Sequence, residues 1–190
     1  MLNDLLVDHV WAGLLLWIIT YSADFCLTML SSRLYQSTGR HFVATEGSME
    51  LTKEFESDVD SLRWSSPRFL KGLFGGIFII LVFWFVRLIQ PTNINLYMFF
   101  LGAFVLRQLA VIVRHSNNLT NYRLLSKDGA ATGRIEYKRW VGYRRSGADL
   151  IAFGALYLFV FAMTGQPFWV GGSLFCFGTG AEHLKQGKIP

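Results

Sequence analysis

Two charged residues, Asp24 and Arg107, lie inside long apolar stretches of the chain. A charge inside a bilayer is costly, and it is usually found beside an opposite charge or in a water-filled cavity. By the helical rise, each lies about 10 Å from the inner end of its predicted membrane span. Because their depths match and their charges are opposite, we expect Asp24 and Arg107 to face each other.

Asp24 belongs to a polar stripe. Thr20, Asp24 and Thr28 follow one another at every fourth position, which places them on one face of a helix. Together with Arg107, this stripe predicts either a structural ion pair that holds helices together or a polar path for an ion or a proton. A third possibility is that Arg107 extends its side chain to the inner interface.

A second polar cluster lies at the inner ends of the predicted spans. It contains Arg114, His115 and Asn118, with His183 near the end of the last span. Such side chains could hold a divalent metal or a lipid phosphate, but no His-x-x-x-His motif fixes a metal geometry. We expect polar capping of the interface, with no metal and no cofactor. Because no nucleophile stands beside a base, we do not expect an enzyme.

These residues are carried by an apolar chain. Of its 190 residues, 52% are hydrophobic and 16% are charged, whereas soluble domains contain about 25% charged residues. At about 20 residues per crossing, the fold class is an all-α, polytopic helical membrane bundle of four to five spans, in a single domain over residues 1–190. The expected spans are 10–30, 70–89, 96–114, 149–164 and 167–183.

Small residues predict close helix contacts in two of these spans. Gly72 and Gly76 are four residues apart in the second span, and Gly172, Cys176 and Gly180 repeat at every fourth position of the fifth. Small residues let helix backbones approach each other in membranes. The pattern does not distinguish contacts within the bundle from contacts between subunits.

The basic residues predict an orientation. Sixteen of the 18 Lys and Arg residues lie in 33–71, in 114–145 or in the carboxyl tail. Under the positive-inside rule, the loops 33–69 and 115–147 and the C-terminus are cytoplasmic, and the N-terminus is outside. We expect a multi-pass protein of the plasma membrane or the bacterial inner membrane, with anionic inner-leaflet headgroups beside its loops.

The first cytoplasmic loop predicts an amphipathic helix. Over 48–62, Leu51, Phe55 and Val59 recur at helical spacing, with acidic residues along the neighbouring edge. The segment 114–145 carries eight cations against two acids, a net charge of +6. We predict that the acidic helix docks on this basic segment, within a subunit or between subunits. The competing interpretation is that both are solvated polar faces, since exposed ion pairs are weak.

The second loop has two interpretations. Asp128-Gly129 stands between strand-prone runs and predicts a β-hairpin. Continuation of the third helix past Asn117 competes with it.

Two functions fit these features. The first is an oligomeric channel or transporter for a small ion, with its pore on a symmetry axis because so few helices leave little room within one subunit. The alternative is a non-transporting scaffold or accessory subunit that binds a protein partner through its charged cytoplasmic loops. Nucleic-acid binding is not expected of a short loop beside a membrane.

Overall fold

The computed structural model describes residues 2–127 and 131–188, and most of this chain is helical. Its helices and strands, including two short 3-10 turns (η1 and η2), are α1 Leu2–Asp8, α2 Val10–Ser37, η1 Gly39–His41, β1 Val43–Thr45, α3 Lys53–Asp60, α4 Pro67–Ile89, η2 Pro91–Asn93, α5 Ile94–Leu125, β2 Ile135–Tyr137, α6 Arg139–Thr164 and α7 Pro167–Gln186.

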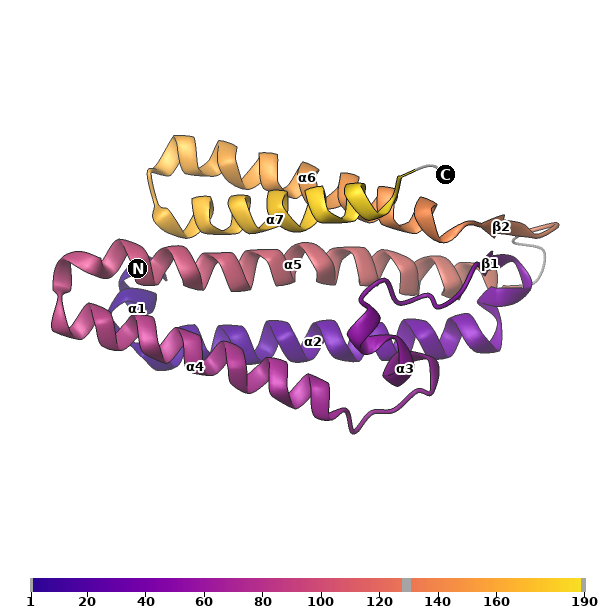
Figure 1. Cartoon of the computed structure of the whole chain (residues 1–190), viewed down its shortest axis with the longest axis horizontal. Coiled ribbons are helices and arrows are strands. Elements are labelled where there is room, and N and C mark those ends of the chain that lie inside the picture. Colours follow the sequence, from indigo (N-terminus) through magenta and orange to yellow (C-terminus); the bar gives the residue numbers. More distant parts are fainter. Residues whose placement is uncertain (1, 128–130, 189–190) are drawn as a thin grey trace.

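Helix α5 is the central element of the bundle. In Figure 1 the α6–α7 hairpin lies on one side of α5, and α2 and α4 lie on the other. Helix α1 and the connections α4–α5 and α6–α7 lie at one end, which we call the hairpin end. Helix α3 and both strands lie at the opposite end, which we call the loop end.

Four helices are long and apolar enough to cross a membrane: α2, α4, α6, and α5 together with η2. This confirms a helical bundle with four candidate membrane spans, and α7 is not among the four. Large apolar side chains such as Phe74, Phe78, Phe159 and Met163 are exposed on the outer faces of α4 and α6. A surface this apolar suits contact with lipid chains rather than water.

Three helices extend at least seven residues further toward the loop end than the hydrophobic stretches predicted. Helix α2 continues to Ser37, α5 continues to Leu125, and α6 already begins at Arg139. Hydrophobicity marks only the part of a helix that contacts lipid. No Pro or Gly follows the apolar stretches of α2 and α5 until after these helix ends, so nothing breaks the helices where polar residues begin.

The two loops pair with each other. Strand β1 lies parallel to β2, with Val43 opposite Ile135, so the partner of β2 comes from the first loop. The predicted hairpin turn at Asp128-Gly129 lies outside the described residues. Its expected first arm is helical up to Leu125, which confirms the competing helix interpretation for that segment. The acidic helix is present as α3, shorter than the predicted 48–62.

Glycines allow α7 to pack closely on α5. A Cβ atom added to Gly102 of α5 would overlap the carbonyl group of Phe168, and one added to Gly171 of α7 would overlap the carbonyl group of Phe99. Backbone of one helix therefore touches backbone of the other, as small residues permit in membrane bundles.

The predicted small-residue contacts are also formed within this chain. Gly72 and Gly76 of α4 lie against the side chains of Tyr21 and Trp17 of α2. Cys176 of α7 is completely buried in the core that α5, α6 and α7 share. The fold thus rests on tight helix pairs on both sides of α5.

We expect Gly102→Val to lower the free energy of unfolding by about 1–3 kcal/mol, because the new side chain would overlap a backbone carbonyl that moves only with α7. Gly75→Val on α4 is the matched control, since nothing lies within 4 Å of a Cβ there. Equilibrium unfolding in mixed micelles measures both. Equal losses of stability in the two variants would contradict the close α5–α7 contact.

Candidate functional site

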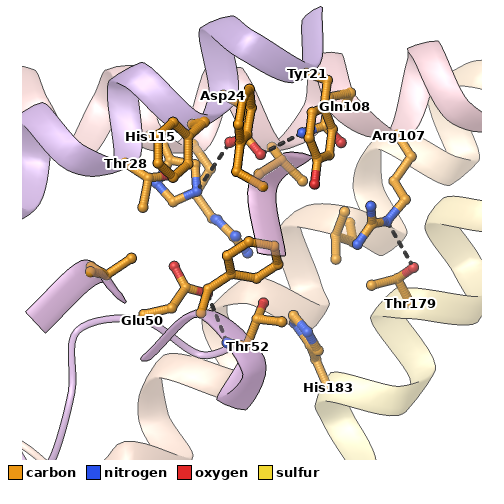
Figure 2. Close-up of a pocket in the computed structure, with 17 residues that line it drawn as sticks. Tyr21, Asp24, Thr28, Glu50, Thr52, Arg107, Gln108, His115, Thr179 and His183 are labelled. Atoms are coloured by element: carbon orange, nitrogen blue, oxygen red, sulfur yellow. Dashed lines mark hydrogen bonds and ion pairs between the residues drawn. The ribbon is translucent and has the colours of Figure 1, made fainter. Parts of the chain in front are cut away.

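A polar pocket lies against α5 toward the loop end (Figure 2). Its cavity measures about 190 Å³, and its walls come from α2, α3 and the segment before it, α4, α5, α6 and α7. Phe25, Phe55 and Phe69 supply part of the lining. The polar lining residues are Tyr21, Asp24, Thr28, Glu50, Thr52, Arg107, Gln108, Arg114, His115, Thr179 and His183.

Asp24 lies midway along α2 and contacts α5. The side-chain amide of Gln108 donates a hydrogen bond to its Oδ2 atom, and Nε2 of His115 lies 3.5 Å from its Oδ1 atom. Gln108 is only 2% exposed, so the interaction is shielded from solvent. The side chain of Asp24 itself keeps 20% of its surface exposed, on the wall of the pocket.

The predicted ion pair between Asp24 and Arg107 is wrong, because the two side chains bond to different partners. Arg107 lines the same pocket, but its Nε atom donates to Thr179 Oγ1 of α7 at 3.3 Å. No carboxylate among the described residues lies within ion-pair distance of Arg107. The reason is helical geometry: successive residues point about 100° apart, so Gln108 faces α2 while Arg107 faces α7.

Only part of the predicted polar stripe lines the pocket. Thr28 is buried and lines the cavity beside Asp24. Thr20 is also buried, but its hydroxyl donates to the carbonyl groups of Leu16 and Trp17 within its own helix. Thr20 therefore satisfies its hydrogen bonds locally and does not line the pocket.

The predicted inner cluster forms two groups. Arg114 donates to the hydroxyl of Ser146 on α6, and that hydroxyl lies 2.8 Å from Nδ1 of His183 on α7. His115 instead turns toward Asp24. Asn118 lines a neighbouring cavity of about 220 Å³ that Arg114 and His115 also border. The structure thus brings Arg114 and His183 together and leaves Asn118 beside them.

The segment 50–59 of the first loop covers the pocket. Glu50 and Thr52 line it from this side, and Glu50 Oε1 accepts a hydrogen bond from the backbone N–H of Thr52. Tyr143 on α6 donates to the carbonyl of Leu51 at 2.8 Å. The cover is therefore attached directly to α6.

An ion pair strengthens this attachment. Both terminal nitrogens of Arg139 donate to the carboxylate of Glu56 on α3, at 3.2 and 2.9 Å. This hydrogen bonding lowers the pKa of Glu56 below its ordinary value. The pair stabilises the docked loop above that ordinary pKa, and its contribution is lost as pH falls through the lowered value. The predicted docking of the acidic helix on the basic segment is confirmed within one chain.

Aromatic side chains fill the bundle between the pocket and the hairpin end. The ring of Trp17 lies 4.7 Å from that of Tyr21 and 5.3 Å from that of Phe104, centroid to centroid. Trp17 is 4% exposed, and Leu101 beside this cluster is 1% exposed. The pocket therefore ends against a packed aromatic layer.

Several residues of the site were not predicted. Gln108 could have been recognised, because it is a polar residue inside a predicted span and adjoins Arg107. Glu50 was identified only as part of an acidic helix edge. Ser146 and Thr179 gave no signal in the sequence, since single hydroxyl residues are common in membrane helices and bond to their own backbone.

Comparison with protein families, with curated proteins and with solved structures finds no match to this chain.

We expect Leu51→Cys and Gly142→Cys to form a disulfide in a background that lacks Cys26 and Cys176, because the Leu51 side chain lies 3.3 Å from the position of a Cβ at Gly142. Arg139→Gln should lower the yield, since it removes the ion pair that holds α3. Gel mobility of the oxidised protein in membranes measures the yield. A yield no higher than that of a Leu51→Cys/Gly75→Cys pair would contradict the docked loop.

Proposed function

We propose that this chain is a small membrane transport protein that receives a small ionic solute from the loop end into the pocket. The observation that carries the proposal is that Asp24, Arg107 and Arg114 all line one cavity between apolar helices. Charged residues at membrane depth usually mark ion or substrate pathways, because burying them for packing alone is costly.

The position of the charges favours a path within one subunit. Asp24, Arg107 and His115 all line a pocket that a single chain builds, whereas the outward faces of α4 and α6 carry apolar side chains. A pore on a symmetry axis between subunits would need polar residues on an outward face. The geometry therefore supports an internal site more than a shared axial pore.

The aromatic layer supports a carrier rather than an open channel. Trp17, Tyr21 and Phe104 pack together between the pocket and the hairpin end. A solute in the pocket would reach the other side only after this layer and the helices around it rearranged. Alternating access of this kind is the usual mode of carriers with a binding site near the midplane.

The scaffold alternative receives less support from the loops. Glu56 and Arg139 bind each other, and Lys138 lies 3.5 Å from Glu46. The charges that would recruit a protein partner are thus partly occupied inside the chain.

We expect purified protein in liposomes to catalyse uptake of a small ionic solute, and Asp24→Asn and Arg107→Gln to reduce uptake at least about tenfold, as loss of a charged contact worth more than about 1.4 kcal/mol would. Initial rates from a panel of labelled ions and small organic ions measure this. Arg87→Gln is the control, because Arg87 pairs with Asp8 near the hairpin end, away from the pocket.

Thermal unfolding of the same preparations separates transport from packing. The transport proposal requires Asp24→Asn to lose uptake while it remains folded at the assay temperature. The proposal would be contradicted if wild-type protein took up no solute of the panel and Asp24→Asn only lowered the unfolding temperature. Asp24 would then be a packing residue.

A further inference from the structure

The walls of the pocket carry opposite charges on different elements. The carboxylates are Asp24 on α2 and Glu50 on the covering loop, whereas Arg107 on α5 points toward Thr179 of α7 (Figure 2). In the same view the guanidinium of Arg107 lies on the far side of the cavity from Glu50. Arg114 also lines the pocket, but it donates to Ser146 on α6. The site therefore carries both signs of charge rather than being uniformly acidic or basic.

Hydrogen-bonding capacity of both kinds is left over around the cavity. Among the described residues, Arg107 donates a hydrogen bond only from its Nε–H, and no group accepts one from its terminal nitrogens. On the other side, Oδ1 of Asp24 lies 3.5 Å from Nε2 of His115 but makes no hydrogen bond, and neither does Nδ1 of His115, a residue that is 9% exposed. Buried polar atoms are normally satisfied, so unsatisfied ones at a cavity point to a missing partner.

A ligand with a single charge fits this arrangement poorly. A lone anion beside Arg107 would face the carboxylates of Asp24 and Glu50, and a lone cation beside those carboxylates would leave the charge of Arg107 without a partner. Like charges at short range are strongly unfavourable where the surroundings are apolar. A ligand that carries both charges places each one beside its opposite.

We propose that the pocket binds a small zwitterion that combines an ammonium group with a carboxylate or a phosphate. The ammonium group lies against Asp24 and Glu50, and the anionic group accepts hydrogen bonds from the free terminal nitrogens of Arg107. The planar guanidinium suits both anions, because it can donate two parallel hydrogen bonds to either. This inference names the substrate class of the proposed transport site and rests on that function.

The size of the cavity agrees with this class. At about 190 Å³ it would hold roughly six waters at the ~30 Å³ that each occupies in the liquid. It lies below the range of about 300–1,000 Å³ typical of pockets for drug-sized ligands. Phe25, Phe69 and Val111 are among the apolar lining residues and would accept a small apolar group attached to the zwitterion.

The shared chemistry can come from two sources: a free amino acid or the headgroup of phosphatidylethanolamine. Calorimetric titration of the full chain in phosphatidylglycerol nanodiscs, which lack ammonium groups, tests the first source with glycine and phosphoethanolamine as probes. Acetate and methylamine serve as single-charge controls. A second set of nanodiscs containing phosphatidylethanolamine tests the second source, through a higher unfolding temperature than in phosphatidylglycerol and through competition with the soluble probes.

We expect at least one zwitterionic probe or phosphatidylethanolamine to bind, and neither acetate nor methylamine to compete at tenfold higher concentration. Arg107→Gln and Glu50→Gln should each weaken binding by about 10–100-fold, the range for loss of a charge-assisted hydrogen bond. Arg107→Lys should weaken it less, since it keeps the charge. Arg87→Gln should leave affinity unchanged.

Three results would overturn the inference. If acetate bound as tightly as glycine and Glu50→Gln did not change the affinity, the pocket would be an anion site. If methylamine bound as tightly as glycine and Arg107→Gln did not change the affinity, the pocket would be a cation site. No binding of any probe and no effect of phosphatidylethanolamine would leave no zwitterion site at all.

The failure of this inference is distinguishable from the failure of the transport proposal. Zwitterion binding without uptake into liposomes would retain the binding site and reject transport. Uptake of an inorganic ion without zwitterion binding would retain transport and reject the substrate class.

Discussion

The arrangement of the bundle depends on one constraint: the carboxylate of Asp24 lies midway along a membrane-length helix and has to be compensated there. Its compensation comes from α5, through the amide of Gln108 and the imidazole of His115. Because both partners are on one helix, the carboxylate fixes the rotation and the axial position of α2 against α5. The rest of the site is built outward from this contact.

Helix α5 serves both sides of the bundle. Toward α2 it presents Gln108 and His115, and toward α7 it presents Arg107 together with the close backbone contact at Gly102. Gln108 and His115 from one face and Arg107 from the other all line the polar pocket. The covering loop lines the pocket with Glu50, and the ion pair between Glu56 and Arg139 attaches this loop to α6.

The sequence predicted the residues of this site better than their pairing. Asp24 and Arg107 stood out because charges are rare in apolar stretches, and both line the pocket. Their direct contact could not be judged by depth alone, since a shift of one residue turns a side chain about 100° around the helix. The side chain that reaches Asp24 is therefore that of Gln108, the immediate neighbour of Arg107.

Charge patterning located the docked loops for a different reason. Opposite net charges on two loops predict attraction without any detail of geometry, and Glu56 and Arg139 form such a pair. The pairing of β1 with β2 was not predicted, because strands of three residues lie below the length at which alternation becomes visible. Helix ends beyond the apolar stretches were missed because hydropathy reports contact with lipid and not the end of a helix.

If the pocket takes up a solute from the loop end, it must be accessible to water from that end and inaccessible beyond the aromatic layer. Cysteine accessibility in proteoliposomes tests this directly, with a membrane-impermeant thiosulfonate and a background lacking Cys26 and Cys176. Val111 lines the pocket, and Val105 is 1% exposed in the core toward the hairpin end. We expect Val111→Cys to react from the loop side and Val105→Cys not to react; an unreactive Val111→Cys, or equal reactivity at both positions, would contradict this route of access.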